Sequence, residues 1–270
     1  MSFDDSGHWY WRDGSSAHEL PLKSDPSRMK KTTLADAKKL GLCPSVTTIL
    51  KAKSSHALES WRQRMVIEAC YNNKDVNIPL DQWSGMVTNE AFEIVGRSAD
   101  EGTQYHLVVE SVVNNTDMPD YELTIPPEFF SGFCSWWDNL GVTCMETEVG
   151  FAHPLGFGGR MDFVGHDDRG RDVFIDWKTQ DTAGKKKCGF YRDSFPVQLA
   201  AYMEGYRHKI SKEMLFLYKP RMISVVISRD EPGRVEHKEW DNPEVYWEAF
   251  KNLFGWWKFD KQYDPSWGVE

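Results

Sequence analysis

The sequence predicts a single α/β domain over residues 1–270, with a mainly helical N-terminal half. Apolar residues recur at helical spacing before residue 141, and short apolar runs typical of buried strands begin at about residue 142. No clear linker, internal repeat or low-complexity tract divides the chain. We therefore expect one domain made of an N-terminal extension (1–43), a helical part (44–141) and a sheet-containing part (142–270).

The helical part is expected to contain three helices. In the extension before it, residues 8–14 have the pattern of a short hairpin strand and turn, and residues 20–43 are polar without a clear pattern. The helical part itself begins with an ordered segment at residues 44–50. The helices are expected at residues 56–71, 89–114 and 126–140. Gly96 and Gly102 would interrupt or tighten the second helix, and Gly141 would end the third. Residues 72–83 would form a loop.

The sheet-containing part alternates strands and helices. Val173, Phe174 and Ile175 form a short apolar run, as expected for a buried strand. By the same criteria we expect strands at residues 142–152, 159–166, 171–178, 214–218 and 223–228, and helices at 194–208 and 244–259.

Asp162 and the triplet Asp176-Trp177-Lys178 are the most informative residues of the chain. They bound a strand, a polar turn and a second strand, so a hairpin would place Asp162 beside Asp176. Lys178 would project to the same side as Asp176, because strand side chains alternate. Two close carboxylates repel each other unless a cation holds them, and oxygen ligands suit Mg²⁺ or Mn²⁺. The alternative is a solvated surface ion pair, but an apolar strand that runs directly into these charges favours a paired or metal-bound site.

Cysteine content and hydropathy limit the class of protein. No apolar run approaches the ~20 residues that span a bilayer, and the acidic N-terminus has no signal-peptide pattern. We therefore expect a soluble, cytoplasmic protein. The 5 cysteines are scattered, without a Cys-x-x-Cys, which argues against a disulfide framework and a structural zinc site.

The net charge of −9 is unusual for a nucleic-acid-binding protein, but its distribution is uneven. Residues 178–192 hold five basic residues and one acidic residue, a net charge of +4. Besides Lys178, the basic residues are Lys185, Lys186, Lys187 and Arg192. This stretch is either a solvated loop or a phosphate contact beside the acidic pair.

Three further features lie on either side of the acidic pair. His106 shares helical spacing with Val109 and Val113, so it is either a core residue or a metal ligand that emerges from a buried face. Glu146 and Glu148 alternate on the strand before Asp162, as surface residues or as a source of one more carboxylate. Gln198 and Tyr202 share one face of the helix that follows Lys178, either as core or as part of the site.

These motifs resemble, in their order, the RecB-like branch of the PD-(D/E)xK nuclease superfamily. That branch has a Gly-x-x-x-His helix (Gly102 to His106), Gly-x-x-Asp (Gly159 to Asp162), Asp/Glu-x-Lys (Asp176 to Lys178) and Gln-x-x-x-Tyr (Gln198 to Tyr202). Further details, in residues 44–50, 61–62 and 198–202, most resemble the mitochondrial genome maintenance exonuclease and its phage and bacterial relatives. The resemblance covers roughly residues 44–205 and implies a central mixed sheet flanked by helices.

The resemblance also implies a metal site and roles for its residues. Mg²⁺ or Mn²⁺ would be held by Asp162, Asp176, the backbone carbonyl of Trp177 and His106, with Glu148 as a further contributor. Lys178 would orient or deprotonate the attacking water, and Gln198 and Tyr202 would position nucleic acid or support the metal ligands. Some relatives carry an iron–sulfur cluster, but no cysteine follows Cys188, so we expect no cluster here.

The expected function is therefore hydrolysis of DNA from its ends, in recombination, repair or viral DNA processing. Partners implied by the resemblance are DNA ends, single-stranded or duplex, and a recombinase, an annealing protein or a single-strand-binding protein. Alternatives are a structure- or sequence-specific endonuclease of the same superfamily, a non-catalytic DNA-binding module and a metalloenzyme that is not a nuclease. We expect Tyr71, Trp83 and Tyr105 to be available for base stacking. Trp136, Trp137, Trp256 and Trp257 are expected to belong to the core.

Overall fold

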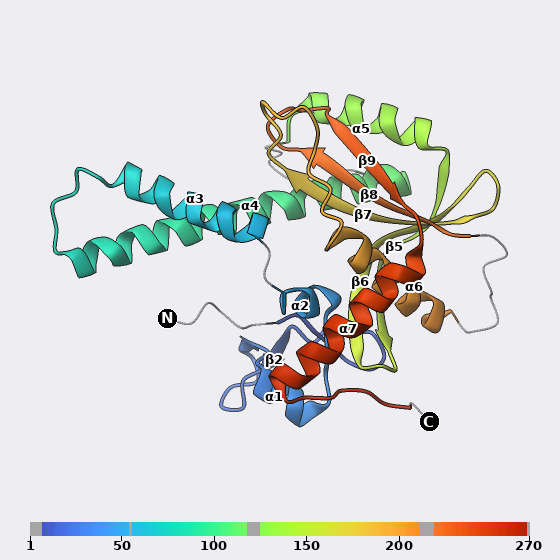
Figure 1. Ribbon diagram of the computed structural model, residues 1–270, viewed down its shortest axis with the longest axis horizontal. Helices are drawn as coiled ribbons and strands as arrows, with labels where there is room; N and C mark the ends of the chain where they lie inside the picture. The colour runs from blue at the N-terminus through green and yellow to red at the C-terminus, as the bar shows by residue number, and fades with distance from the viewer. Residues whose placement is uncertain (1–6, 54–55, 118–124, 211–218, 269–270) are drawn as a thin grey trace. The chain divides into compact units, whose positions relative to one another are not determined.

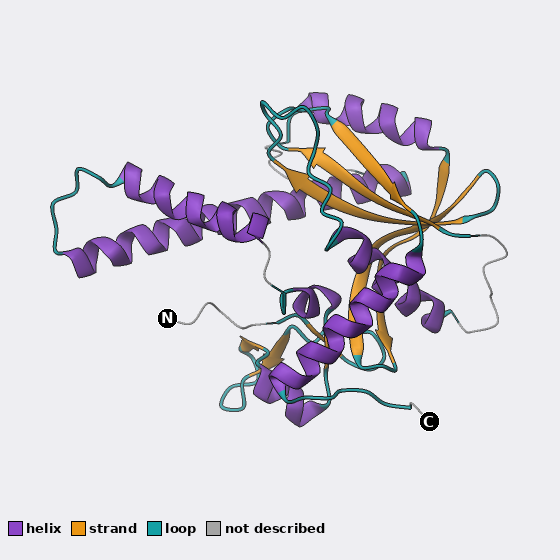
Figure 2. Ribbon diagram, in the orientation of Figure 1, coloured by secondary structure: helices purple, strands orange, loops and turns teal. Residues whose placement is uncertain are grey.

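The computed structural model describes residues 7–53, 56–117, 125–210 and 219–268 (Figure 1). The chain forms two compact units: Met1–Ala52 together with Leu123–Glu270, and Lys53–Glu122. The expectation of one domain stays a prediction. Figure 2 shows that, among the described residues, strands lie only in the first of these units, whereas the second is helical.

The first unit is built on a five-stranded mixed sheet with the order β5-β6-β7-β8-β9. Its β7–β8 pair is parallel and the other three pairs are antiparallel. The strands are β5 (Val142–His153), β6 (Phe157–Asp167), β7 (Asp172–Gln180), β8 (Arg221–Ser228) and β9 (Val235–Trp240). Helix α6 (Phe195–Lys209) lies in the connection between the parallel strands β7 and β8, as crossover connections require.

Helices cover both faces of this sheet, which confirms the predicted fold class (Figure 1). Helix α5 (Pro127–Leu140) packs through Phe133 and Trp136 on Trp177 of β7. On the other face, α6 packs through Tyr206 on Phe174 of the same strand. Helix α7 (Pro243–Lys261) packs on α6. Alternation along β7 therefore sends Trp177 to one helix layer and Asp176 to the other.

The N-terminal extension is an ordered part of the first unit. Strand β1 (Trp9–Tyr10) pairs with β4 (Cys43–Pro44), and β2 (Glu19–Pro21) pairs with β3 (Met29–Lys31). Helix α1 (Leu34–Leu40) follows β3 and begins with a Thr33–Asp36 capping box. Helix α2 (Val46–Leu50) follows β4. Their apolar residues join the core of the sheet and α7. The short hairpin strand and turn predicted at residues 8–14 are present, since Tyr10 bridges Ser16 across the turn, and β1 also pairs with the distant Cys43–Pro44.

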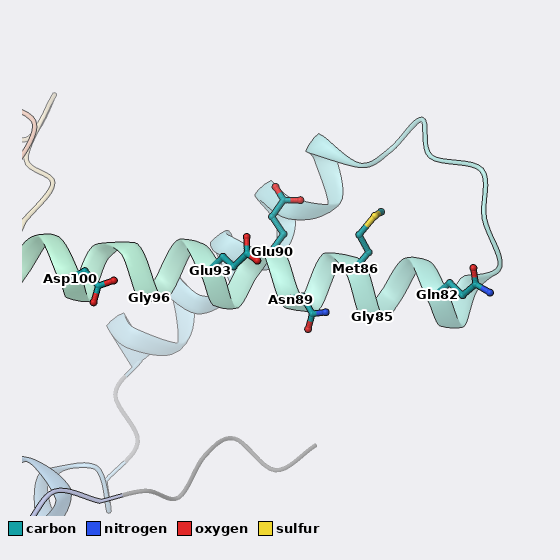
Figure 3. A pocket seen from close by; sticks show the side chains of 8 residues that line it. All are labelled: Gln82, Gly85, Met86, Asn89, Glu90, Glu93, Gly96 and Asp100. Atoms are coloured by element: carbon teal, nitrogen blue, oxygen red, sulfur yellow. The ribbon is translucent and has the colours of Figure 1, made fainter. Parts of the chain in front are cut away.

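The second unit is a pair of helices, α3 (His56–Asn72) and α4 (Leu80–Asn114) (Figure 1). Ala69 of α3 and Val87 and Ala91 of α4 are buried in one cluster. The Trp83 indole donates a hydrogen bond to the Asn73 carbonyl, which ties the start of α4 to the end of α3 (2.9 Å). An open hollow runs along α4, between Gln82 and Asp100 (Figure 3). Only α4 residues line this hollow, and none is a predicted site residue.

Two predictions for α4 are wrong. The helix begins at Leu80, nine residues before the expected start, so the predicted loop is shorter. The helix also continues through Gly96 and Gly102 without a break. A glycine costs only about 1 kcal/mol in a helix interior, which 35 residues of continuous helix can absorb.

The C-terminal elements differ from the prediction at two places. Strand β9 was not predicted, because its sequence is largely charged, as is usual for an edge strand. Trp256 was expected in the core but is exposed beside Phe259, whereas Trp257 is buried. The strand predicted at residues 214–218 lies outside the described residues.

Candidate active site

The acidic pair lies where two strands of the sheet separate. Strands β6 and β7 pair from His166↔Asp172 to Phe163↔Ile175, and the next residues along this register are Asp162 and Asp176. Beyond Phe163, β6 continues to pair with β5 but no longer with β7. The backbone N–H of Trp177 thus has no backbone partner on β6, and it donates to the Asp162 side chain at Oδ2 instead (2.8 Å). This bond joins the two strands at the point where they separate.

Asp176 is held on both sides by charged or polar groups. Its Oδ2 lies 2.6 Å from Nζ of Lys178, and its Oδ1 accepts a hydrogen bond from Nε2 of Gln198 (2.8 Å). The same Gln198 nitrogen donates to the Tyr202 hydroxyl (2.9 Å). Asp176 is fully buried, so these contacts offset the cost of removing its charge from water. Gln198 thus connects the Tyr202 helix to the carboxylate.

Glu148 of β5 lies across from Asp162 of β6. A carboxylate oxygen of each lies within 4.8 Å of the other, and Glu148 Oε2 also contacts Nε of Arg160 at 2.5 Å. The backbone of Glu148 has φ +53°, the left-handed region that costs a non-glycine residue about 1–3 kcal/mol. Such strain is typical of functional positions.

Glu146 has a different environment from Glu148. A bulge between Cys144 and Glu146 interrupts the register of β5. Glu146 accepts a long hydrogen bond from the Tyr206 hydroxyl (3.4 Å), whereas Glu148 contacts Arg160. The alternation of side chains along a regular strand therefore does not predict the positions of Glu146 and Glu148.

His106 lies on α4 in the second unit and is partly buried. Val109 and Val113, which share its helical spacing, are buried. The proposed role of His106 as a metal ligand stays a prediction.

Burial dominates the electrostatics of the site. It raises the pKa of Asp162, although Lys178, the Trp177 N–H and Arg160 each act in the opposite direction. Burial, followed by the charges of Asp176 and Asp162, raises the pKa of Tyr202 well above its usual value. Tyr202 therefore stays protonated at neutral pH. Clustered carboxylates whose charge is costly are suited to a divalent cation with oxygen ligands, so these residues fit a Mg²⁺ or Mn²⁺ site.

The sequence of this region matches a known family. Residues 132–252, which include Asp162, Asp176, Lys178, Gln198 and Tyr202, match the model of the PD-(D/E)XK nuclease superfamily. This segment belongs to the PD-(D/E)XK nuclease superfamily. Membership implies a metal-dependent nuclease that acts on DNA.

Other comparisons add little to this assignment. No curated protein matches the chain. Among solved structures, "Crystal structure of SSO0001" matches at 14% identity and a TM-score of 0.34, over 72% of this chain and 85% of that one. None of the helices described in the structure is both long and apolar enough to cross a membrane.

Two glycines let α6 approach the sheet of the PD-(D/E)XK fold closely. A Cβ at Gly159 would lie 2.8 Å from the Phe151 ring and 2.9 Å from the Tyr202 ring. A Cβ at Gly205 would lie 2.0 Å from the same Phe151 ring. The glycine of the Gly-x-x-Asp motif is therefore a packing requirement, because it leaves room for the helix that carries Gln198 and Tyr202.

The basic loop of the nuclease domain is exposed but firmly anchored. Lys185, Lys186, Lys187 and Arg192 are all exposed. The Gln180 amide makes two hydrogen bonds with the Gly189 backbone, at 2.8 and 3.0 Å. Across from it, Asp230 accepts from the backbone N–H of Thr182 (2.7 Å), and Arg234 donates to the Lys185 carbonyl (3.0 Å). The β8–β9 turn thus fixes the loop that leads from Lys178 to Gln198.

These anchoring residues were not identified from the sequence. Asp230 and Arg234 lie about fifty residues beyond the loop, in a turn rich in charged residues that resembles many surface turns. Asp230 and Arg234 could have been identified from the high density of charged residues at 229–236, which directly follows the strand that pairs with β7.

The aromatic residues predicted for base stacking differ in accessibility. Tyr71 is 68% exposed and carries Nζ of Lys74 over its ring at 4.3 Å. Tyr105 is only 5% exposed, so its ring is not available for stacking on a base. Trp83 is partly buried and holds the α3–α4 turn. Of the three, only Tyr71 retains the predicted availability.

Proposed function

We propose that this chain is a divalent-metal-dependent exonuclease of the RecB-like branch, which hydrolyses DNA from its ends. The observation that carries the proposal is the Asp162–Asp176–Lys178 cluster on separating strands, with Gln198 and Tyr202 behind it. Hydrolysis of a phosphodiester needs a cation site, a proton-transferring or charge-stabilising group and a fixed geometry. This cluster offers all three.

The residues proposed to hold Mg²⁺ or Mn²⁺ are Asp162, Asp176, the Trp177 carbonyl and His106, with Glu148 as a further contributor. A bound metal would lower the pKa of water and neutralise charge on the scissile phosphate. Lys178 would orient or deprotonate the attacking water and stabilise negative charge as it develops. Gln198 holds Asp176 in one orientation and is itself held by Tyr202, so the pair acts as a support for the carboxylate.

The proposed setting is DNA recombination, repair or viral DNA processing, with a recombinase, an annealing protein or a single-strand-binding protein as partner. The preference for an exonuclease rests on the order of motifs from His106 to Tyr202, and the fold itself is shared by endonucleases. The two activities differ in their need for a DNA end.

The chain is expected to degrade linear DNA but not circular DNA. End-labelled linear single strands and duplexes, a circular single strand and a covalently closed duplex are incubated with Mg²⁺, Mn²⁺ or EDTA. Efficient cutting of either circle would remove the exonuclease proposal, and discrete plasmid bands would favour the endonuclease alternative. DNA left intact under all conditions, yet bound, would favour a non-catalytic module.

The anchored basic loop is expected to bind DNA phosphates through Lys186 and Lys187. Because the loop is fixed at both ends, its backbone loses little conformational freedom on binding. The double variant Lys186→Ala/Lys187→Ala should weaken DNA binding and lower the slope of log K against log salt by about 1.4 on single strands. Fluorescence anisotropy between low and moderate salt measures this slope.

Lys38→Ala/Lys39→Ala is the matched control, since these two lysines are also adjacent and exposed. An equal loss in both double variants would mean that general charge, and not the loop, determines binding.

A further inference from the structure

Tyr10 reaches the metal-site strands from the N-terminal extension. Strand β1 packs across β6: a Cβ at Gly158 would lie only 2.7 Å from Cβ of Tyr10. Gly158, Arg160 and Asp162 alternate along β6 and share one face of it. Because Gly158 has no side chain, the Tyr10 ring can lie directly on this face, where it is 5% exposed.

Electrostatic interactions connect Tyr10 to the acidic site. Burial raises the pKa of Tyr10 to about 12, and the charged groups that act on it are, in decreasing order, Arg160, Glu148 and Asp162. These are the groups of the acidic site and its neighbouring arginine. The hydroxyl consequently stays protonated at neutral pH and serves as a donor.

The Tyr10 hydroxyl has no hydrogen-bond partner among the residues that the structure describes, and its oxygen is not fully enclosed. Because this oxygen is not fully enclosed, the unused donor is accessible to a ligand that lies on the same face as the charged cluster. By contrast, the Tyr263 hydroxyl lies within hydrogen-bond distance of two backbone carbonyls, at 2.8 and 3.0 Å, and its one hydrogen is donated there. That tyrosine has a structural role only.

Arg160 supplies charge at the same place. Its side chain is 60% exposed and its Nε lies 2.5 Å from Glu148. An exposed guanidinium can bind a phosphate through two parallel hydrogen bonds. A cation coordinated by Glu148 would release Arg160 for that role.

We propose that Tyr10 and Arg160 form a phosphate-binding subsite beside the Glu148–Asp162 carboxylates. The ligand is a DNA backbone phosphate that neighbours the one being cleaved, with Tyr10 donating one neutral hydrogen bond and Arg160 supplying the charge. The subsite rests on the proposed nuclease function and adds the N-terminal extension to the DNA-binding surface.

The test measures binding of a fluorescent single-stranded oligonucleotide by anisotropy, in Ca²⁺ and in EDTA, with gel analysis to show that the DNA stays intact. Tyr10→Phe keeps the ring on Gly158 and removes only the hydroxyl. We expect its Kd in Ca²⁺ to rise about tenfold without a change in salt slope, because a neutral donor to a charged group is lost. Arg160→Gln should weaken binding by a similar factor and reduce the slope by about 0.7.

Two comparisons sharpen the test. The loss caused by Arg160→Gln should be larger in Ca²⁺ than in EDTA, because Glu148 holds Arg160 when no cation competes for it. The double variant should lose less affinity than the product of the single losses, since both groups hold one phosphate.

Tyr263→Phe and Arg207→Gln are the matched controls, the second because Arg207 is a partly exposed arginine paired with a glutamate (2.7 Å). Binding by Tyr10→Phe and Arg160→Gln within twofold of wild type, or equal losses in the controls, would overturn the subsite. If Tyr10→Phe lowers the melting temperature, the exposed Arg160→Gln variant decides the question.

The outcomes also separate the subsite from the nuclease proposal. Wild-type protein that binds DNA through both groups but cleaves none in Mg²⁺ or Mn²⁺ would refute the nuclease activity alone. Wild-type protein that cleaves DNA while both variants bind normally would refute the subsite alone.

Discussion

Lys178→Ala is expected to reduce the cleavage rate by about 10²–10³, the loss seen when one charge-stabilising donor is removed from an active site. Lys178 is the ammonium group that contacts Asp176, at 2.6 Å, and it lies in β7 two residues after that carboxylate, as in the Asp/Glu-x-Lys motif. Single-turnover cleavage of end-labelled single- and double-stranded DNA in Mg²⁺, Mn²⁺ or EDTA measures the effect.

Stability must be followed in the same experiment. Removing Lys178 leaves the buried Asp176 without its cationic partner, which can cost about 3–5 kcal/mol of folding free energy. Lys178→Met keeps the aliphatic stem and gives a second variant. Lys238→Ala is the control. Both lysines lie on strands with Nζ over an aromatic ring, 5.8 Å from the Phe195 centroid for Lys178 and 4.1 Å from the Trp240 centroid for Lys238. Undiminished cleavage by a folded Lys178 variant would refute the mechanism.

Asp162→Asn is expected to abolish both cleavage and the stabilisation of the protein by Mg²⁺ or Mn²⁺. A cation at one hundred times its Kd stabilises the folded state by about 2.7 kcal/mol, and each kcal/mol shifts the melting temperature of a domain of this size by about 2–4 °C. The variant should lose this shift, since it lacks a carboxylate that the cation needs. Thermal denaturation with and without the metal measures it.

In the absence of metal, the same substitution should raise the melting temperature at neutral pH. Burial raises the pKa of Asp162 in the folded state, so its ionised form lowers stability above that pKa. This cost fades as the pH falls through the folded-state pKa towards the unfolded value, where both states are protonated. The advantage of Asp162→Asn should therefore narrow as the pH decreases.

Asp172→Asn is the control for this pair of measurements, because burial also raises the pKa of Asp172 but its partner is His166, outside the metal cluster. A metal-dependent shift that persists in Asp162→Asn, or disappears in Asp172→Asn, would contradict the assignment of the metal site.

The hairpin around Asp162 and Asp176 could be predicted because its signal is local. Val173 to Ile175 is a buried strand, and the polar turn before it leaves only one register that puts both apolar faces inside. The helix of Gln198 and Tyr202 was predicted from Phe195, Leu199 and Tyr206 at helical spacing, although the structure buries α6 on every side over residues 195–203.

Other parts depend on contacts between distant residues, which no local pattern contains. Strand β1 pairs with the distant Cys43 and Pro44 as well as with its own turn, and it places Tyr10 over Gly158 of β6. The bond from the Trp177 N–H to Asp162 exists because β6 leaves β7 there, and strand divergence is set by the packing of whole helices.

That bond also bears on which metal the site selects. Trp177 already engages Oδ2 of Asp162, and Asp176 is engaged at Oδ1 by Gln198 and at Oδ2 by Lys178. Because one oxygen of Asp162 is engaged in this way, Ca²⁺ can bind here only without the two-oxygen coordination that it readily accepts elsewhere. A small octahedral ion completed by water molecules is the better match, so the divergence of two strands contributes to ion selectivity.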